Sequence, residues 1–155
     1  MTPRESEAST LLLLIEHELA LKEFYEACAE AFPEHKNYWL EIASDEAGHA
    51  EAIRDLFDVT VTLNMARFKS AAVATSLSYV KDSTAQLNGG AYTMNEALAT
   101  ALDFEKAMID GQFFEIFNTD SQKCIDVYRK LAEDTRNHVK KIESQWVTQR
   151  VAKDS

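Results

Sequence analysis

Glycine and proline are scarce in this sequence, which has four glycines and two prolines among 155 residues. Tight turns depend on these two residue types, so few sharp reversals of the chain are expected. The abundant alanine, leucine, glutamate and lysine favour helices. We therefore predict an all-α protein, with a single domain over residues 1–155 and flexible ends at residues 1–8 and 148–155.

Long hydrophobic runs and basic clusters are also lacking. The longest uninterrupted aliphatic run, residues 11–15, is far below the roughly 20 residues that span a bilayer, and the N-terminus is too charged for a secretory signal. With 16 Lys and Arg against 26 Asp and Glu, the net charge is −10. We expect a cytoplasmic protein that binds neither a membrane nor nucleic acid.

Cysteine is limited to Cys28 and Cys124, and neither belongs to a Cys-x-x-Cys pair. Both fall on apolar faces of expected helices, which is typical of small buried side chains with reduced thiols. A disulfide between them is the less favoured alternative in a cytoplasmic protein.

Hydrophobic periodicity predicts five helices. They cover residues 9–32, 34–57, 65–87, 94–117 and about 120–147. Pro33 ends the first, Asn64 caps the third, Thr93 and Glu96 form a capping box for the fourth, and Thr119 or Asp120 caps the last. The alternating residues 59–62 are expected to form an extended connection, and the third helix to cross the bundle between two halves.

Four of these helices carry ionisable side chains within an otherwise apolar seam. Glu18 lies in the first seam, Glu46 and His49 in the second, Glu105 in the fourth and His138 in the last. Residues three apart on a helix share a face, so Glu46 and His49 point the same way. A carboxylate in such a seam needs a cation, hydrogen bonds or a proton.

The two halves of the chain resemble each other. Glu18 and Glu105 are 87 residues apart, and His49 and His138 are 89 residues apart. These similar offsets indicate a duplicated helical hairpin. We predict a four-helix bundle of two hairpins joined by a long crossover that contains the additional helix.

One Glu on each of two helices, with Glu-x-x-His on each of the other two, is the ligand layout of ferritin-like di-iron bundles. In addition, the spacing of Glu18 and Tyr25, followed by the sequence Asp-Glu-Ala-Gly-His at residues 45–49, resembles the rubrerythrin family, and the likeness extends over about residues 9–146. The resemblance implies a ferritin-like fold, a homodimer and an oxidoreductase that acts on peroxide or oxygen. It also implies two iron ions, with zinc or manganese as alternatives, held by Glu18, Glu46, His49, Glu105 and His138.

The chain departs from the family pattern at Thr135, where the second motif would have a Glu. Asp134 is the alternative donor at this place, although it lies one position off the seam. The chain also lacks the four cysteines of the rubredoxin-like domain of rubrerythrins, so an enzyme of this type would need a separate electron donor. The alternative function is a non-enzymatic structural or metal-binding bundle with zinc, a single ion or only paired charges in its site.

Three further polar residues, Tyr25, Gln112 and His17, bear on the site. Tyr25 is expected to be a core residue, with a redox or ligand-bonding role as the alternative. Gln112, at the matching position of the second half, is either a donor to a ligand or a satisfied polar group. His17 lies off the seam and is expected on the surface.

Overall fold

The computed structural model describes the backbone of residues 3–58 and 62–154 and the side chains of residues 5–57 and 62–151. The described residues form α-helices and short 3-10 helices without a β-strand, which confirms the all-α prediction. The α-helices are α1 (Pro3–Ala31), α2 (Lys36–Arg54), α3 (Ser70–Asn88), α4 (Met94–Asp110) and α5 (Gln122–Asp154). The predicted extended stretch at residues 59–62 lies mostly outside the described residues.

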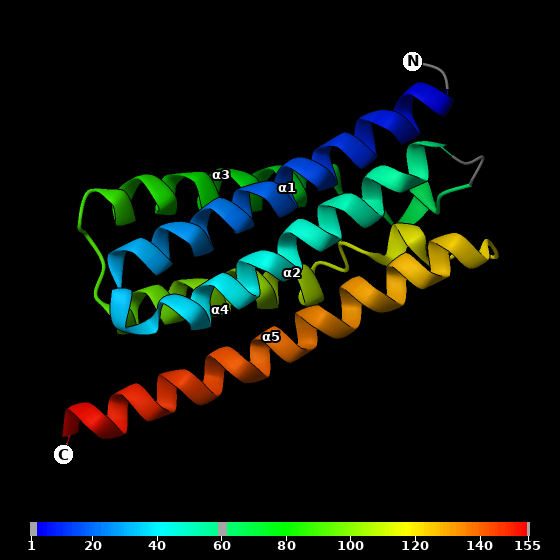
Figure 1. Ribbon diagram of the computed structural model, residues 1–155. Helices are drawn as coiled ribbons and strands as arrows, with labels where there is room; N and C mark the ends of the chain where they lie inside the picture. Colours follow the sequence, from blue (N-terminus) through cyan, green and yellow to red (C-terminus); the bar gives the residue numbers. More distant parts are fainter. Residues whose placement is uncertain (1–2, 59–61, 155) are drawn as a thin grey trace.

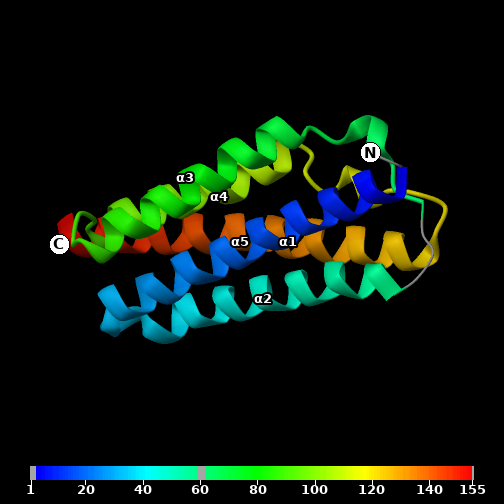
Figure 2. The ribbon, with the colours of Figure 1, turned by 90° about the horizontal axis from the view of Figure 1, so that it is seen from above.

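The helices pack as two antiparallel pairs with one additional helix. α1 packs along α2, and α4 along α5, while α2 also faces α5 (Figure 1). α3 packs against the other side of α1, so that α2 and α3 lie on opposite sides of it (Figure 2). α1 therefore buries two faces, whereas a surface helix buries one.

The predicted seams form the core. The predicted seam of the second helix, spaced by three and four residues, extends over α2 and the 3-10 helix that follows it (Asp55–Asp58). All six of its positions are buried: Trp39, Ile42, Glu46, His49, Ile53 and Leu56. Cys28 and Cys124 are buried free thiols, as expected. Burial raises the pKa of the Cys28 thiol, so this side chain behaves as a hydrophobic group.

Several helix ends differ from their predicted positions. α1 begins before Ser9 and α5 continues beyond Val147, while α3 begins at Ser70, after a short 3-10 helix that includes Met65. Asn64 makes no side-chain cap, and α5 is capped by the hydroxyl of Ser121, which accepts from the backbone N–H of Cys124 at 3.5 Å. The capping box of α4 is confirmed, because Thr93 and Glu96 bond to each other's backbone N–H groups.

The largest difference is the end of α4, which stops at Asp110 instead of continuing to Phe117. The N–H of Phe113 donates to the carbonyl of Met108, the N–H of Gln112 donates to that of Ile109, and Gln112 has a φ of 54°. This is a Schellman ending, whose left-handed residue is usually glycine. Gly111 precedes that position, and a Cβ there would lie 2.6 Å from the ring of Phe113.

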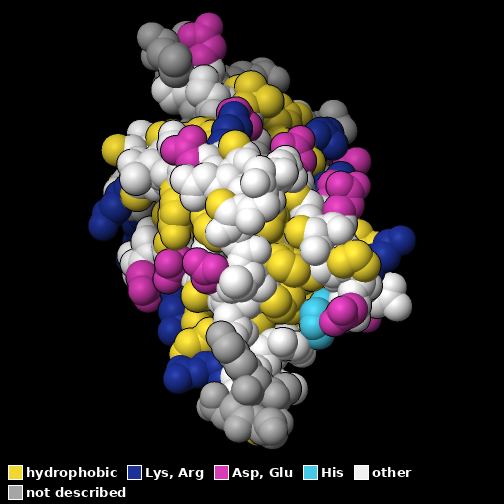
Figure 3. Space-filling model, turned by 90° about the vertical axis from the view of Figure 1, so that its left-hand side faces the viewer, with side chains coloured by type: hydrophobic (Ala, Val, Ile, Leu, Met, Phe, Trp, Pro, Cys, Tyr) yellow, Lys and Arg dark blue, Asp and Glu magenta, His cyan; other side chains and the backbone are white. Residues whose placement is uncertain are grey.

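The two chain ends lie at opposite ends of the bundle (Figure 1). On the face drawn in Figure 3, acidic and basic side chains are interspersed with hydrophobic ones. Within the described part of the chain, no helix combines the length and the apolar character needed to cross a bilayer.

Candidate metal centre

The five ionisable seam residues meet inside the bundle. Each comes from one of four helices, and at most 3% of its surface is exposed. The helices and their residues are α1 with Glu18, α2 with Glu46 and His49, α4 with Glu105, and α5 with His138. Because each residue occupies a core position of its own helix, packing the apolar seams together necessarily brings these side chains together.

The residues form two groups that share Glu46. Glu18, Glu46 and His49 offer one set of ligand atoms, and Glu46, Glu105 and His138 offer the other, with all atoms of a set within 4.8 Å of one another. Nδ1 of His49 lies 3.5 Å from Glu18 Oε2 and 3.4 Å from Glu46 Oε2. Nδ1 of His138 lies 3.2 Å from Glu46 Oε1 and 3.1 Å from Glu105 Oε1.

Many atoms of this cluster lack a hydrogen bond. Of the seven buried side-chain N and O atoms without one among the described residues, five belong to the cluster. They are Glu18 Oε2, both Glu46 carboxylate oxygens, His49 Nδ1 and Glu105 Oε2. Burying a polar atom without a hydrogen bond costs about 1–3 kcal/mol. Four of these five atoms have only the ion-pair contacts of 3.2–3.5 Å between the glutamates and the histidines, so a bound cation would stabilise them further.

The outer nitrogen of each imidazole is held by an aspartate from the opposite pair of helices. Nε2 of His49 lies 2.8 Å from Asp134 Oδ2, and Nε2 of His138 lies 2.8 Å from Asp45 Oδ2. A carboxylate only accepts, so each Nε2 carries the donated proton. In the neutral imidazole this leaves the lone pair on Nδ1, which faces the glutamates and is free to bind a metal.

The pKa values of Glu18 and of both histidines are strongly raised. Burial, together with the neighbouring Glu46, raises the pKa of Glu18 to about 8. Burial alone would lower the pKa of both histidines, but their contacts with the glutamates outweigh it and raise the values to about 12 for His49 and about 11 for His138. Protons on Glu18, His49 and His138 thus offset the negative charge of the carboxylates, as a bound metal ion would do.

Tyr25 is a core residue, as expected, and its hydroxyl also contacts the cluster. It is fully buried and stacks on Trp39 at 5.8 Å between ring centroids, and its hydroxyl donates to Oε1 of Glu105 at 2.9 Å. Burial, followed by the charge of Glu105, raises the pKa of Tyr25 well above its usual value. The hydroxyl therefore stays protonated and fixes one oxygen of Glu105.

Thr135 occupies the place that a fourth glutamate would take, and it provides no carboxylate. Its hydroxyl donates to the backbone carbonyl of Leu131 at 2.7 Å. Asp134 lies on the outer side of His49, with its side chain 29% exposed, and does not join either group of ligand atoms. Gln112 is exposed at the end of α4.

Two features escaped the sequence analysis. The expectation for His17 was wrong, because His17 is 1% exposed and hydrogen bonds to Ser76 of α3 at 2.8 Å. The paired roles of Asp45 and Asp134 were also missed, although each lies four residues before the histidine of its own helix and the two are 89 residues apart, as the histidines are. That repeated spacing was the available signal.

The donor set fits a divalent metal ion. Carboxylate oxygens and imidazole nitrogens suit iron, manganese and zinc, and the orphaned atoms are the ones that would bind it. No protein-family model, curated protein or solved structure matches the chain.

Proposed function

We propose that this chain is a ferritin-like metal protein of the rubrerythrin type, an oxidoreductase that reduces peroxide or oxygen with electrons from a separate donor. The strongest support is the set of five buried atoms without hydrogen bonds on Glu18, Glu46, Glu105 and His49. They come from three helices and converge on one place. A fold that needed only stability would gain by replacing them with apolar groups.

Some residues of the site would bind the metal ions, and others orient the histidines that bind them. Glu18, Glu46, His49, Glu105 and His138 would hold two ions, with Glu46 common to both sets. When bound, a pair of redox metals supplies electrons and an open coordination position for the oxidant. Asp45 and Asp134 keep the imidazoles in the tautomer that presents Nδ1, because their carboxylates accept from Nε2.

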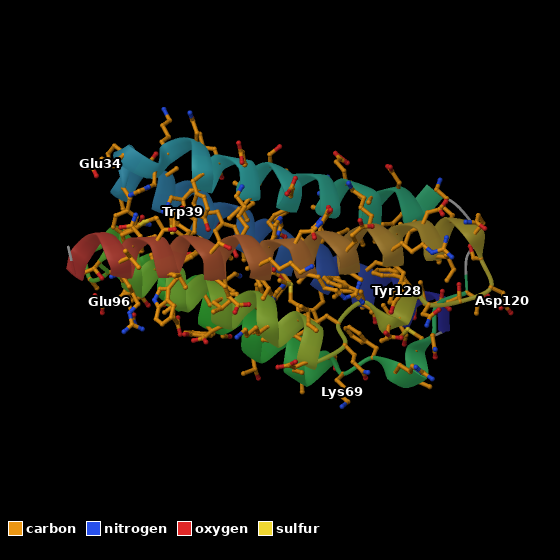
Figure 4. All side chains as sticks on the ribbon, turned by 90° about the horizontal axis from the view of Figure 1, so that it is seen from below. Glu34, Trp39, Lys69, Glu96, Asp120 and Tyr128 are labelled. Atoms are coloured by element: carbon orange, nitrogen blue, oxygen red, sulfur yellow. The ribbon has the colours of Figure 1, made fainter. Side chains whose placement is uncertain are left out.

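The surroundings of the cluster control water and protons. Tyr25 donates to Glu105 and so holds one of its oxygens, while Trp39 and Ile42, fully buried two turns and one turn before Glu46 on α2, belong to the apolar core. Figure 4 labels Trp39 toward the end of the bundle where α2 begins. A dry site strengthens each electrostatic contact within it.

Thr135 favours a second candidate, a non-enzymatic zinc protein. Without a fourth glutamate, each set of ligand atoms has three donors, which matches the three protein ligands of many zinc sites. Zinc has no redox chemistry, so a zinc-filled site would not reduce peroxide or oxygen, and we assign this candidate a structural or binding role.

Metal analysis of protein purified without chelators decides between the two candidates. About two iron or manganese ions per chain, lost in Glu18→Gln and kept in the exposed control Glu23→Gln, would support the enzyme, and Fe(II)-loaded protein should then be oxidised by added peroxide. Zinc alone would support the second candidate. Failure to bind any metal, even after anaerobic loading with Fe(II), would overturn both.

A further inference from the structure

Thr135, at the position where the ligand layout would have a fourth glutamate, lines a hollow in the surface of the protein. The hollow, of about 230 Å³, lies between the end of α4 and α5. Met108 and Thr135 line it and are 1% exposed, whereas Gln112 and Arg136 line it from the exposed surface. The hollow thus leads from solvent to buried side chains.

The inner end of the hollow lies close to two cluster residues. Met108 comes three residues after Glu105 on α4, and Thr135 comes three residues before His138 on α5. Side chains three apart on a helix are neighbours on one face. The hollow therefore ends one helical turn from a carboxylate and an imidazole of the cluster.

The rim of the hollow carries a cation without a carboxylate partner. Within the described part of the chain, Arg136 forms no ion pair, and its positive charge acts to lower the pKa of the neighbouring Tyr128. Glu115 is the acid that also lines the hollow, but Tyr128 donates to it at 2.8 Å and Arg67 lies 3.6 Å from it. Figure 4 labels Tyr128 on α5, at the opposite end of the bundle from Trp39.

The charge of a filled cluster favours an added anion. Glu18, Glu46 and Glu105 supply three negative charges, and two divalent ions supply four positive charges. Among the ions and their ligand residues one positive charge would remain, and the next carboxylates, Asp45 and Asp134, lie on the outer side of the imidazoles. An anion that enters the hollow would reach Thr135, one helical turn from His138.

We propose that this hollow binds a small carboxylate anion, of the size of acetate, which supplies the carboxylate that the chain lacks at Thr135. This inference rests on the proposed metal-binding function. Arg136 attracts the anion at the rim, and the apolar walls, which include Ile109 and Phe114, accept its methyl group. Metal and carboxylate then bind cooperatively, and each raises the affinity for the other by the same factor.

The test is a titration of Co(II) into chelator-treated protein, in buffer with sodium acetate or with sodium chloride at equal ionic strength. Cobalt absorption bands report ligand geometry, so the readout is independent of activity. In the wild type, acetate should raise the affinity for the second ion by about tenfold, a usual size for coupling between two ligands. Inorganic phosphate, which is larger and lacks an apolar end, should not.

Variants test whether acetate acts from the hollow beside Thr135. Thr135→Glu should bind two ions tightly without acetate and lose the response to acetate, whereas Thr135→Val should keep the response. Arg136→Gln should weaken acetate binding by several-fold and leave metal binding in chloride unchanged, and Arg129→Gln, an exposed arginine on the same helix, should change neither. If Thr135→Glu does not fold, Ala132→Met fills the hollow with a neutral side chain and should abolish the response.

The outcomes separate this inference from the proposed function. Metal binding in the wild type that is indifferent to acetate would overturn the inference and leave the metal site standing. A response that persists in both Thr135→Glu and Ala132→Met would place the carboxylate elsewhere. Absence of metal binding in either buffer would overturn the proposed function itself.

Discussion

Glu18 is a carboxyl group that the folded chain holds away from water and beside Glu46. Its raised pKa of about 8 means that the folded protein keeps a proton that the unfolded chain releases near 4.5. Between these two values the folded state binds more protons, so its stability decreases as the pH rises. His49 and His138 act in the same direction above 6.5, because their folded pKa values are also raised.

We expect chelator-treated protein to lose stability steadily as the pH rises from about 4.5 to about 8. Glu18→Gln removes one of the groups responsible, so the variant should show a shallower decrease and exceed the wild type in stability at the upper end. Urea unfolding at several pH values measures this. The control Glu23→Gln should follow the wild type, and a parallel decrease in Glu18→Gln would contradict the assignment of the effect to Glu18.

The end of α4 shows how a helix stops where its sequence would permit it to continue. Hydrophobic residues persist beyond Asp110, but Phe113 folds back over Gly111 and leaves Gln112 in the left-handed region. A residue with a Cβ is strained in that region. The strain falls on a residue that lines the hollow next to Thr135.

Gln112→Gly should therefore stabilise the protein by about 1 kcal/mol, because glycine occupies the left-handed region without steric cost. Thermal or urea unfolding measures the change. Gln112→Ala keeps the Cβ and should stay close to the wild type. A glycine variant that is no more stable than the alanine variant would show that Gln112 is not strained.

Periodicity in the sequence was sufficient to place the core of each helix but not its ends. The seam from Trp39 to Leu56 was predicted because an apolar residue every three or four positions has one physical explanation, burial of that face. The end of α4 was missed because its left-handed residue is a glutamine. His17 was misplaced because α1 is covered on a second face by α3, and a single seam does not reveal a second partner.

The candidate site was predictable to a similar degree. The cluster residues were found because charged groups stand out within apolar seams and recur at nearly equal offsets. The hydrogen-bond partners of the outer histidine nitrogens were not found, because Asp45 and Asp134 are partly exposed and lie outside the seams. Their contacts join residues from different halves of the chain, and an individual helix pattern contains no information about such pairs.

Across the whole molecule, the two aspartate and histidine pairs connect α2 with α5 and thus one helical hairpin with the other. We expect Asp45→Asn and Asp134→Asn each to reduce metal affinity by about tenfold or more, since an amide no longer fixes the imidazole through a charged acceptor. Competition with a chelator measures the affinity. The near-equivalence of the two pairs predicts losses of similar size.

Glu133→Gln, on the exposed face of α5 beside Asp134, is the matched control and should bind metal as the wild type does. If neither asparagine variant differed from it, the aspartates would not orient the histidines.

These two pairs also bear on the order in which the chain folds. Their members are separated by 85 and 93 residues, whereas α1 and α2 are joined by only a few residues and can pair locally. Contacts between distant residues must overcome a large loop-closure entropy, so they form after local ones. We therefore expect the complete cluster to form late, when the two hairpins dock, although the hairpin of α1 and α2 already carries one set of ligand atoms, Glu18, Glu46 and His49.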